Sequence, residues 1–360
     1  MDRPEALALL ERSSVMHVAS TTGDGKPVLR AVHGVVVDGA VAFHGARAGE
    51  KMAALGRAAV ISAQEAVAYL PSYFVDPQRA CAATTFYRSV QVHGRLELVD
   101  DPQAKARVLH ALLAKHQPAG GHLAIKEDHP LYRNAVEGIL IARVSLDQIA
   151  GKAKLGQNRQ PEELVKILEL LWRRGHHGDP RAIDLVRQAN PAVPTPPFLE
   201  APEGIRLLCA LSTDQSAAAL SLLEGTYWNA GIPDAVAARA LLSSAAWVGA
   251  QDSSGTLVAM ARAISDTAMS AWIYDVVVRS DWRGKGVGKA IMRLLLDHPA
   301  VRNARKVRLS TRDAPGFYER FGFRDIRSDA PPSTSKEMMM MLATPEPPLE
   351  WRVTDLLGNR

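Results

Sequence analysis

Arg283-Gly284-Lys285-Gly286-Val287-Gly288-Lys289 decides the fold of the C-terminal half of the chain. An apolar run, residues 271–278, precedes it, and an amphipathic run, residues 290–296, follows it. This order predicts a strand, a glycine-rich turn and a helix. Free backbone N–H groups and the helix dipole point the same way at a helix N-terminus, so such a turn can bind phosphate. Because glycine lets a pyrophosphate approach the backbone closely, the stretch predicts a ligand that carries a diphosphate.

Length and charge bound the class of protein. A chain of 360 residues is long for one hydrophobic core, which predicts two domains or more. The composition, 47% hydrophobic and 22% charged, is that of a globular protein. The net charge of +5 is spread: residues 1–200 hold 24 basic and 21 acidic residues, and residues 201–360 hold 19 and 17. Neither half resembles the concentrated basic face of a nucleic-acid-binding protein, so we expect no nucleic-acid partner.

Apolar runs, cysteines and histidines set further limits. No apolar run approaches the ~20 residues of a membrane span, and residues 1–5 open a short amphipathic helix rather than a signal peptide. Cys81 and Cys209 lack metal-ligand spacing, and ten of the eleven histidines are scattered before residue 178. We therefore expect no metal site and no membrane partner. The expected location is the cytoplasm, with both thiols as small core residues.

A proline-rich segment divides the chain. Residues 190–202 contain Pro191, Pro194, Pro196, Pro197 and Pro202, which forbid a helix and favour an extended chain. The predicted order is a domain over residues 1–150, a loop and helical extension over 151–190, a linker over 191–202, a domain over 203–345 and a tail over 346–360.

Residues 1–150 read mainly as short strands, which predicts an antiparallel split β-barrel. The expected strands are Val15–Ser20, Val28–Val37, Ala40–His44, Ala59–Ser62, Ser89–Leu98 and Gly138–Ser145, and the expected helices are Glu50–Gly56 and Pro102–His116. Residues 160–189 read as two helices, with Gly175 as the stop of the first. This helical pair is expected to pack against the barrel or to bridge the domains.

Residues 203–345 alternate in a mixed α/β order. The expected strands are residues 205–208, 246–250, 256–264, 271–278, 306–310 and 337–343, and the expected helices are residues 214–230, 233–243, 290–296 and 315–321. Met338–Met341 reads as a buried terminal strand, with a methionine-lined pocket as the alternative.

A second motif sharpens the glycine-rich turn. The pattern Arg283-x-x-Gly286-x-Gly288 is followed by Ala314-Pro-Gly-Phe-Tyr318-Glu-Arg-Phe-Gly-Phe323. No Walker Gly-Lys-Ser/Thr is present, which argues against nucleotide hydrolysis, and no ribose-binding acid supports a Rossmann site. In order and spacing, both motifs resemble the GCN5-related N-acetyltransferases (GNAT) over about residues 203–345.

The GNAT resemblance implies a set of site residues. Arg283 to Lys289 would hold the pyrophosphate of acetyl-CoA, Val276 and Val278 would bind its pantetheine arm through backbone groups, and Ala314 would contact the same molecule. Tyr318 would protonate the leaving thiolate after direct attack by an amine, a reaction that needs proximity and an acid. The alternative for Tyr318 is an amphipathic core residue.

Other residues of this half have two possible roles each. Asp275 stands inside an apolar strand, so it is either the proton acceptor of the reaction or a hydrogen-bond acceptor with a structural role. Trp228, Trp247 and Trp272 line a substrate pocket or, as is commoner, fill a core. No residue marks the acceptor amine.

The N-terminal half contains two short motifs. They are Phe43-His44-Gly45-Ala46-x-x-Gly49-Glu50-Lys51 and the stretch from Ala82 to Gly94, with Tyr87-Arg88-Ser89 at its centre. They resemble the FMN-binding split barrels of the pyridoxamine 5'-phosphate oxidase type, especially the nitroimidazole-resistance branch, over about residues 5–150. The segment Gly151–Arg159 also resembles a loop of FMN-binding regulators, although no recognition helix accompanies it.

The split-barrel resemblance implies FMN at a homodimer interface. Basic and hydroxyl groups would hold its phosphate, with Arg30, Lys51, Arg88 and Ser89 as the candidates. His44 and Tyr87 would lie near the ring or the ribityl chain. FAD or haem are the alternatives to FMN. Alternatively, the charged residues are surface charges and His44 is an ordinary strand residue. The substrate segment of true pyridoxine-phosphate oxidases is missing, which argues against vitamin B6 oxidation.

Together the two halves predict an acetyl-CoA-dependent N-acetyltransferase fused to a flavin-binding domain. The acceptor would be a small-molecule or a protein amine. The alternatives are an FMN-dependent oxidoreductase of small molecules and a regulator that responds to flavin or acetyl-CoA.

Overall fold

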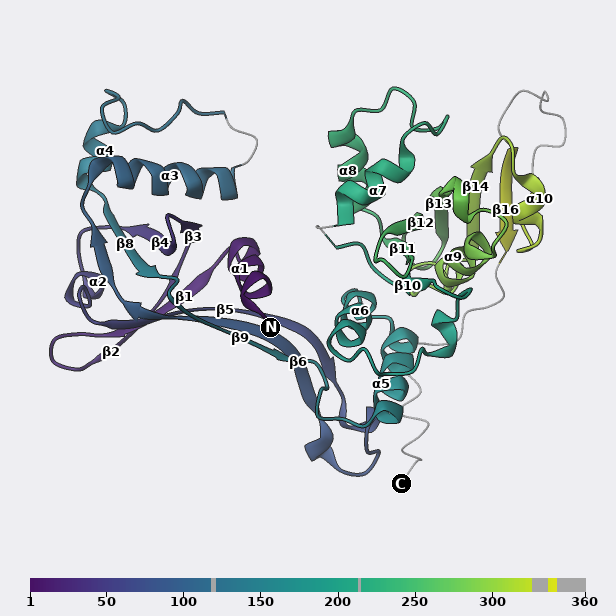
Figure 1. Cartoon of the computed structure of the whole chain (residues 1–360), viewed down its shortest axis with the longest axis horizontal. Helices are drawn as coiled ribbons and strands as arrows, with labels where there is room; N and C mark the ends of the chain where they lie inside the picture. Colours follow the sequence, from purple (N-terminus) through teal and green to yellow (C-terminus); the bar gives the residue numbers. More distant parts are fainter. Residues whose placement is uncertain (118–120, 213–214, 326–335, 342–360) are drawn as a thin grey trace. The chain divides into compact units, whose positions relative to one another are not determined.

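The computed structural model describes residues 1–117, 121–212, 215–325 and 336–341. Its contacts divide the chain into two compact units (Figure 1). The first unit joins Met1–Tyr69 to Thr85–Lys154, and the second joins Leu70–Thr84 to Leu155–Arg360. The helical extension and the proline-rich segment therefore belong to the second unit. The predicted tail, residues 346–360, lies outside the described residues.

The first unit contains two antiparallel sheets. One has the order β2 (Pro27–Val32), β1 (Met16–Thr21), β5 (Ala58–Leu70), β6 (Thr84–Arg95) and β9 (Gln148–Lys154). The other has the order β3 (Gly34–Val37), β4 (Ala40–Gly45), β8 (Leu140–Ser145) and β7 (Glu97–Val99). The predicted antiparallel fold is confirmed, as two sheets that do not close into one barrel within the described residues.

The helices of the first unit are α1 (Arg3–Arg12), α2 (Glu50–Ala53), α3 (Pro102–His116) and α4 (Arg133–Gly138). A capping box starts α1, because the Asp2 carboxylate accepts from the Glu5 N–H while the Glu5 carboxylate accepts from the Asp2 N–H. Asp101 caps α3 by accepting from the Ala104 N–H, a role that aspartate commonly takes before the first turn of a helix.

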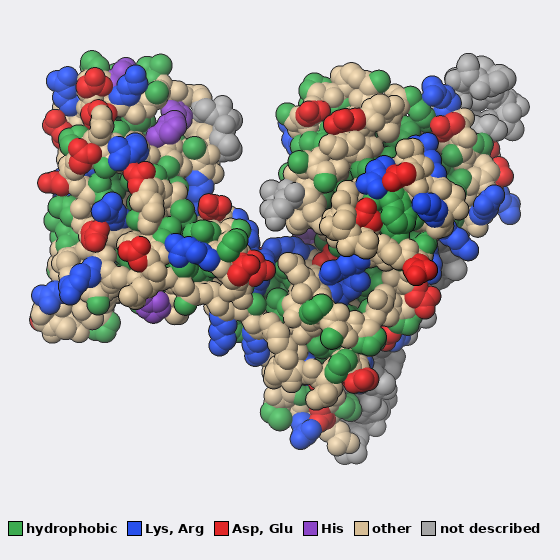
Figure 2. Space-filling model, viewed as in Figure 1, with side chains coloured by type: hydrophobic (Ala, Val, Ile, Leu, Met, Phe, Trp, Pro, Cys, Tyr) green, Lys and Arg blue, Asp and Glu red, His purple; other side chains and the backbone are tan. Residues whose placement is uncertain are grey.

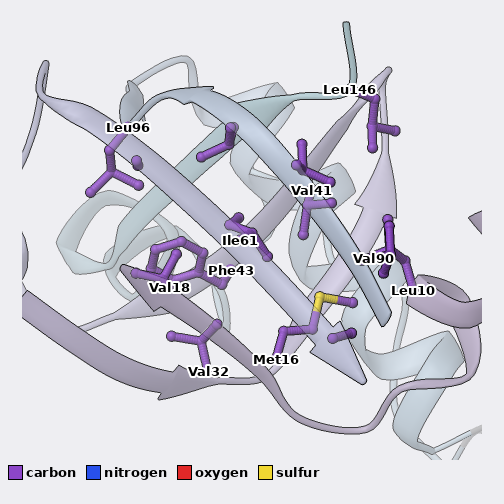
Figure 3. Packing of buried hydrophobic residues seen from close by; sticks show 14 of the residues in the cluster. Leu10, Met16, Val18, Val32, Val41, Phe43, Ile61, Val90, Leu96 and Leu146 are labelled. Atoms are coloured by element: carbon purple, nitrogen blue, oxygen red, sulfur yellow. The ribbon is translucent and has the colours of Figure 1, made fainter. Parts of the chain in front are cut away.

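The core of the first unit lies between α1 and strands of both sheets (Figure 3). Phe43 of β4, Ile61 of β5 and Val90 of β6 are fully buried there. Each such side chain stabilises the fold by roughly 1.5–3 kcal/mol relative to exposure. A second cluster joins α3 to β3 and β4 through Val108 and Val35.

Several sequence predictions for this unit differ from the structure. The strand expected over Val28–Val37 is two strands, β2 and β3, and the one expected over Ser89–Leu98 is divided between β6 and β7; in both cases the two parts lie in different sheets. The strand expected at residues 59–62 extends to Leu70, because small residues such as Ala66 and Ala68 do not interrupt the extended chain. The loop expected from Gly151 begins as strand β9, which pairs with β6 from Tyr87↔Lys154 to His93↔Gln148. Side chains on β9 alternate between exposed and half-buried, so its sequence shows no apolar run.

The second unit contains one mixed sheet. Its order is β10 (Arg206–Leu208), β11 (Ala246–Gln251), β12 (Leu257–Ser265), β13 (Ser270–Val278), β14 (Lys306–Thr311), β16 (Lys336–Met341) and β15 (Arg324–Asp325). β13 and β14 are parallel, whereas the other pairings are antiparallel. The predicted α/β fold is thus confirmed. Met338 of β16 is buried, and residues 342–343 of the predicted strand lie outside the described residues.

The helices of the second unit are α5 (Pro161–Arg174), α6 (Asp179–Ala189), α7 (Ser216–Leu223), α8 (Asp234–Leu242), α9 (Val287–Leu296) and α10 (Pro315–Glu319). Both α7 and α9 pack on strands of the sheet. The helix expected over residues 214–230 ends at Leu223, because Gly225 adopts a φ of 71° and turns follow. Within the described residues, no helix is long and apolar enough to cross a membrane.

The helical pair α5–α6 contacts the end of α9 and the residues that follow β10 in the second unit. Trp172 donates from Nε1 to Asp297 Oδ2 at 2.6 Å and stacks on Phe198. The Asp184 carboxylate accepts from the N–H groups of Cys209 and Ala210. The pair is therefore part of this unit's own core.

The residues at the tip of the β5–β6 hairpin, Leu70–Thr84, also belong to this unit. Phe74, in the 3-10 helix Ser72–Phe74, is fully buried. The Arg174 guanidinium lies 5.3 Å from its ring centroid. Arg174 forms a buried ion pair with Asp179, with a distance of 2.5 Å between Nη2 and Oδ1. The hairpin tip, the end of α5 and the start of α6 are thus held together.

His298 makes the stability of the second unit depend on pH. Burial, and then the positive charge of Arg302, lowers the pKa of His298 to about 3. Between that pKa and the ordinary value of about 6.5, the unfolded chain binds a proton that the folded chain does not, so stability falls as pH falls. We expect the wild type to lose about 2 kcal/mol more than His298→Gln between pH 7.5 and pH 5, at 1.36 kcal/mol per pH unit. Urea unfolding at both pH values measures this difference, and equal losses would contradict the prediction.

Candidate functional site

A cavity opens in the second unit where β13 and β14 part. The two strands pair only from Ser270↔Lys306 to Trp272↔Arg308 in the described part of the chain. Farther along β13, Asp275 has a φ of 53°, and the register against β12 shifts between Met260 and Arg262. This β-bulge bends β13 away from its neighbour. The resulting cavity measures ≈ 1610 Å³ and includes Val276 and Val278 in its wall.

The glycine-rich turn forms one end of this cavity. Gly286 precedes α9 as its N-cap with a φ of 83°, and Gly284 has a φ of 74°, conformations that favour glycine. Their left-handed backbone brings the N-terminus of α9 to the cavity wall. Of the predicted residues in this stretch, Arg283, Gly284, Gly286, Gly288 and Lys289 line the cavity.

The other two residues of the stretch have different surroundings. Val287 is only 1% exposed and starts the apolar face of α9. Lys285 lies with Nζ 4.8 Å from the Trp282 ring centroid. Neither side chain lines the cavity. Backbone N–H groups, rather than these side chains, are what this turn offers to an anion.

Tyr318 and Ala314 lie in the wall of the same cavity. Tyr318 is 8% exposed and packs edge-on against Phe317 and Phe323. Burial, followed by the nearby Tyr227 and Asp313, raises the pKa of Tyr318 above its ordinary value. The phenol therefore keeps its proton at neutral pH and can donate it to an anion that forms beside it.

Asp275 lines the cavity, but its carboxylate is already paired. Arg262 Nε donates to Asp275 Oδ2 at 2.5 Å, and both side chains are nearly buried. The same guanidinium lies 4.9 Å from the Tyr274 ring centroid. These contacts favour the structural reading of Asp275, because the ion pair holds the carboxylate at the bulge.

The three tryptophans divide between pocket and core. Trp228 and Trp272 line the cavity, whereas Trp247 is 4% exposed and belongs to an apolar cluster with Leu223 and Met260.

The six flavin candidates of the first unit do not share one face. Arg88 is buried and donates from Nε and Nη2 to Glu65 Oε2. Arg12 also pairs with that carboxylate, at 3.1 Å. Tyr87 and Ser89 flank Arg88 on β6 and so project from the opposite face of the strand. Arg88 is therefore engaged by Glu65 inside the fold. Its position in the sequence did not indicate this ion pair.

His44 and Lys51 do lie together. An added Cβ at Gly45 would stand 2.3 Å from Lys51 Nζ, so the amine lies over the backbone beside His44. Burial, and then the charges of His33 and Lys51, lower the pKa of His44. The ring of His33 is 5.1 Å from that of His116, between centroids. The sixth candidate, Arg30, is exposed on β2.

The sequence motifs do not include His33 and His116, whose rings meet near His44. Their signal in the sequence was the excess of histidine before residue 178, which does not say which histidines meet. No group of His, Cys, Asp and Glu in the described residues could hold a metal ion. Cys209 is buried as expected, but Cys81 is exposed, so its assignment to a core was wrong.

Comparisons with known proteins agree with this division of the chain. Residues 2–153 match the family model described as pyridoxamine 5'-phosphate oxidase, and residues 243–325 match that of the acetyltransferase (GNAT) domain. The chain therefore carries a domain of the pyridoxamine 5'-phosphate oxidase type over residues 2–153 and a GNAT domain over residues 243–325.

Individual relatives cover one half or the other. An uncharacterized N-acetyltransferase, ycf52 of Porphyra purpurea, is 38% identical over 78 residues, which are 20% of this chain and 42% of that protein. A GNAT-family acetyltransferase structure from Xanthomonas campestris pv. campestris is 35% identical, with 34% of this chain and 87% of that chain covered and a TM-score of 0.30. An FAD- and haem-binding protein from Mycobacterium smegmatis is 20% identical, with 45% and 77% covered and a TM-score of 0.37. The chain thus spans about two fifths of the length of the curated relative.

Proposed function

We propose that this protein is an acetyl-CoA-dependent N-acetyltransferase. The observation that carries the proposal is that the glycine-rich turn and Tyr318 line one cavity, which opens where β13 and β14 part. The turn would receive the diphosphate, and Tyr318 would stand at the acetyl end. Both groups come from distant segments of the sequence and serve the two ends of one extended ligand.

Each wall of the cavity has a role in the proposed reaction. Backbone N–H groups at the start of α9 bind the diphosphate, while the side chains of Arg283 and Lys289 add positive charge. Val276 and Val278 stand where β13 has left β14, so backbone groups on that edge can bind the amides of the pantetheine arm. An amine then attacks the acetyl carbonyl, the carbon–sulfur bond breaks, and Tyr318 gives its proton to the thiolate.

The proposal is tested with the purified full chain. Isothermal titration should show acetyl-CoA binding, and a thiol-release assay with small amines and lysine-containing peptides should show turnover. A protein that binds no acetyl-CoA, or that releases no thiol with any amine, would refute the proposed activity.

Gly286→Ala should weaken acetyl-CoA binding about tenfold. An alanine at a φ of 83° is strained by roughly 1–2 kcal/mol, and its Cβ would stand 3.3 Å from Pro202 Cγ. Relief of this strain turns the N–H groups of the turn away from the diphosphate. Gly255→Ala is the matched control, since Gly255 has the same φ and no atom within 4 Å of an added Cβ. Equal affinities of the two variants in titration would count against the role of Gly286.

A second proposal is that the first unit binds a flavin, FMN in particular, whose ring supplies redox chemistry when bound. Lys51 over the Gly45 backbone, with His44 and His33 beside it, offers charge and hydrogen bonds for a phosphate. Arg88 does not fit this role, because Glu65 engages it. Purified protein should show flavin absorbance or take up added FMN, and Lys51→Ala should weaken that uptake. No uptake of FMN or FAD would refute the proposal.

The alternatives to an acetyltransferase are an FMN-dependent oxidoreductase of small molecules and a sensor that responds to flavin or acetyl-CoA, and we propose that the protein forms a homodimer through its first unit. Tyr318→Phe separates a sensor from an enzyme: a sensor keeps ligand binding and its cellular effect, whereas an acetyltransferase loses turnover. Sedimentation equilibrium gives the oligomeric state, and a monomer at all concentrations would exclude the dimer.

A further inference from the structure

Three acidic side chains line the cavity of the second unit within the described residues: Glu224, Asp275 and Asp313. Asp275 is held by Arg262. Glu224 is exposed and accepts from Ser221 Oγ at 3.3 Å. Asp313 lies between β14 and α10 in the segment that leads to Tyr318, and no ion pair engages it among the described residues.

The segment around Asp313 is held in place from both sides. The Arg312 N–H donates to the Tyr227 hydroxyl at 3.1 Å, and the Arg312 guanidinium lies 3.8 Å from the Tyr227 ring centroid. The Ala314 N–H donates to Thr311 Oγ1 at 3.2 Å. These contacts fix the backbone on either side of Asp313, whose exposed side chain lines the cavity.

Asp313 also lies near the proposed acid. Its negative charge contributes, after burial and Tyr227, to the raised pKa of Tyr318. Both residues line the cavity in which the amine and the thioester would meet.

We propose that Asp313 is the carboxylate that receives the protonated acceptor amine beside Tyr318 and takes its proton. This inference rests on the proposed acetyltransferase function and names its acceptor class, a basic alkylamine that is an ammonium ion at neutral pH. Attraction between ammonium and carboxylate draws such an amine to the reacting carbon, whereas a weakly basic aryl amine gains nothing from it.

The proton balance follows from these roles. One ammonium proton passes to the Asp313 carboxylate and on to solvent, which leaves a neutral amine. Its nitrogen forms a bond to the acetyl carbon, and the carbon–sulfur bond breaks as the Tyr318 phenol protonates the sulfur. The second nitrogen proton returns to the Tyr318 phenolate, so the products are an amide, a thiol and one released proton.

Other charged and titratable groups of the neighbouring elements line the same cavity. They are Arg312 and Arg320 from the α10 segment, Glu224 and Tyr227 from the segment after α7, and the Arg262–Asp275 pair on β12 and β13. Arg262 is compensated by Asp275, and Arg312 lies on the Tyr227 ring. Asp313 remains as the carboxylate beside Tyr318 that can meet an incoming cation.

The test compares Asp313→Asn with the wild type, and with Glu319→Gln as the matched control. Glu319 follows Tyr318 on α10 and is exposed, but it does not line the cavity. Acetyl transfer to butylamine, cadaverine and lysinamide is measured as kcat/KM from pH 7 to pH 10, with aniline as the weakly basic comparator. Titration with acetyl-CoA is the second measurement.

Asp313→Asn should lower kcat/KM for the alkylamines about 10- to 100-fold at pH 7, which lies at the lower end of acid–base contributions. The loss should shrink toward pH 10, where the amine (pKa about 10.4) enters increasingly neutral. Aniline turnover, acetyl-CoA affinity and the Glu319→Gln rates should stay within about twofold of the wild type. A loss below twofold at pH 7, or an equal loss at every pH, would overturn the inference about Asp313 but leave the proposed acetyltransferase function standing. A wild type without any acetyl transfer would overturn the proposed function and this inference with it.

Discussion

Tyr318→Phe is expected to lower kcat by about 100-fold or more, within the range of a lost general acid. The variant removes only a hydroxyl from a side chain that is 8% exposed and packed between Phe317 and Phe323. Its fold and its affinity for acetyl-CoA should therefore stay close to those of the wild type. Because burial keeps the phenol protonated, its loss removes a proton donor over the whole neutral range. Single-turnover thiol release measures the step directly.

The control for this experiment is Tyr274→Phe. Tyr274 lines the same cavity, but it is 37% exposed and stacks on Trp272. Loss of its hydroxyl should change kcat less than threefold or so, since it is not placed as the acid. If Tyr318→Phe kept wild-type kcat while still binding acetyl-CoA, another group or water would have to protonate the thiolate.

Asp179→Ala is expected to destabilise the second unit by about 3–5 kcal/mol, the usual cost of leaving one partner of a buried ion pair alone. Asp179 and Arg174 have side chains only 2% and 4% exposed. The Asp179 carboxylate also accepts from the His176 N–H at the start of α6. Its loss leaves a buried guanidinium above Phe74 and an uncapped turn. Chemical unfolding followed by tryptophan fluorescence reports the effect, because Trp172 lies on α5.

Asp281→Ala provides the comparison. Asp281 pairs with Arg279 at 2.7 Å, but its side chain is 58% exposed. Exposed pairs contribute about 0–1 kcal/mol, so this variant should unfold close to the wild type. Similar losses in the two variants would mean that the Arg174–Asp179 pair is more hydrated than its burial indicates.

The sequence predicted those parts of the second unit that depend on local chemistry. Gly284 and Gly286 mark the turn because only glycine readily adopts their left-handed backbone. The partner of Asp275 could not be predicted, since Arg262 meets it only through the pairing of β12 with β13. Asp313 carries no motif of its own, and its place beside Tyr318 depends on the hydrogen bond from Arg312 to Tyr227.

In the first unit, the sequence left a different kind of feature unpredicted. The succession of short strands predicted the antiparallel sheets. On the side shown in Figure 2, charges of both signs are mixed over the surface of each unit. The succession of strands did not predict which basic residues stay available to bind a phosphate. Arg88 and Lys51 looked equivalent as candidates for a phosphate site, yet Glu65 engages one of them and the backbone of Gly45 lies under the other. Such differences arise from contacts between strands and are absent from any single segment.

Residues 70–84 have a consequence for how this protein can be divided. They are encoded within the first half of the chain, yet their buried Phe74 belongs with Arg174 in the second unit. A fragment that starts at Leu155 would keep the whole acetyltransferase motif set and still lack a piece of its own core. The two halves are thus interleaved rather than joined end to end, and a recombination event that exchanged either half at one breakpoint would damage the other.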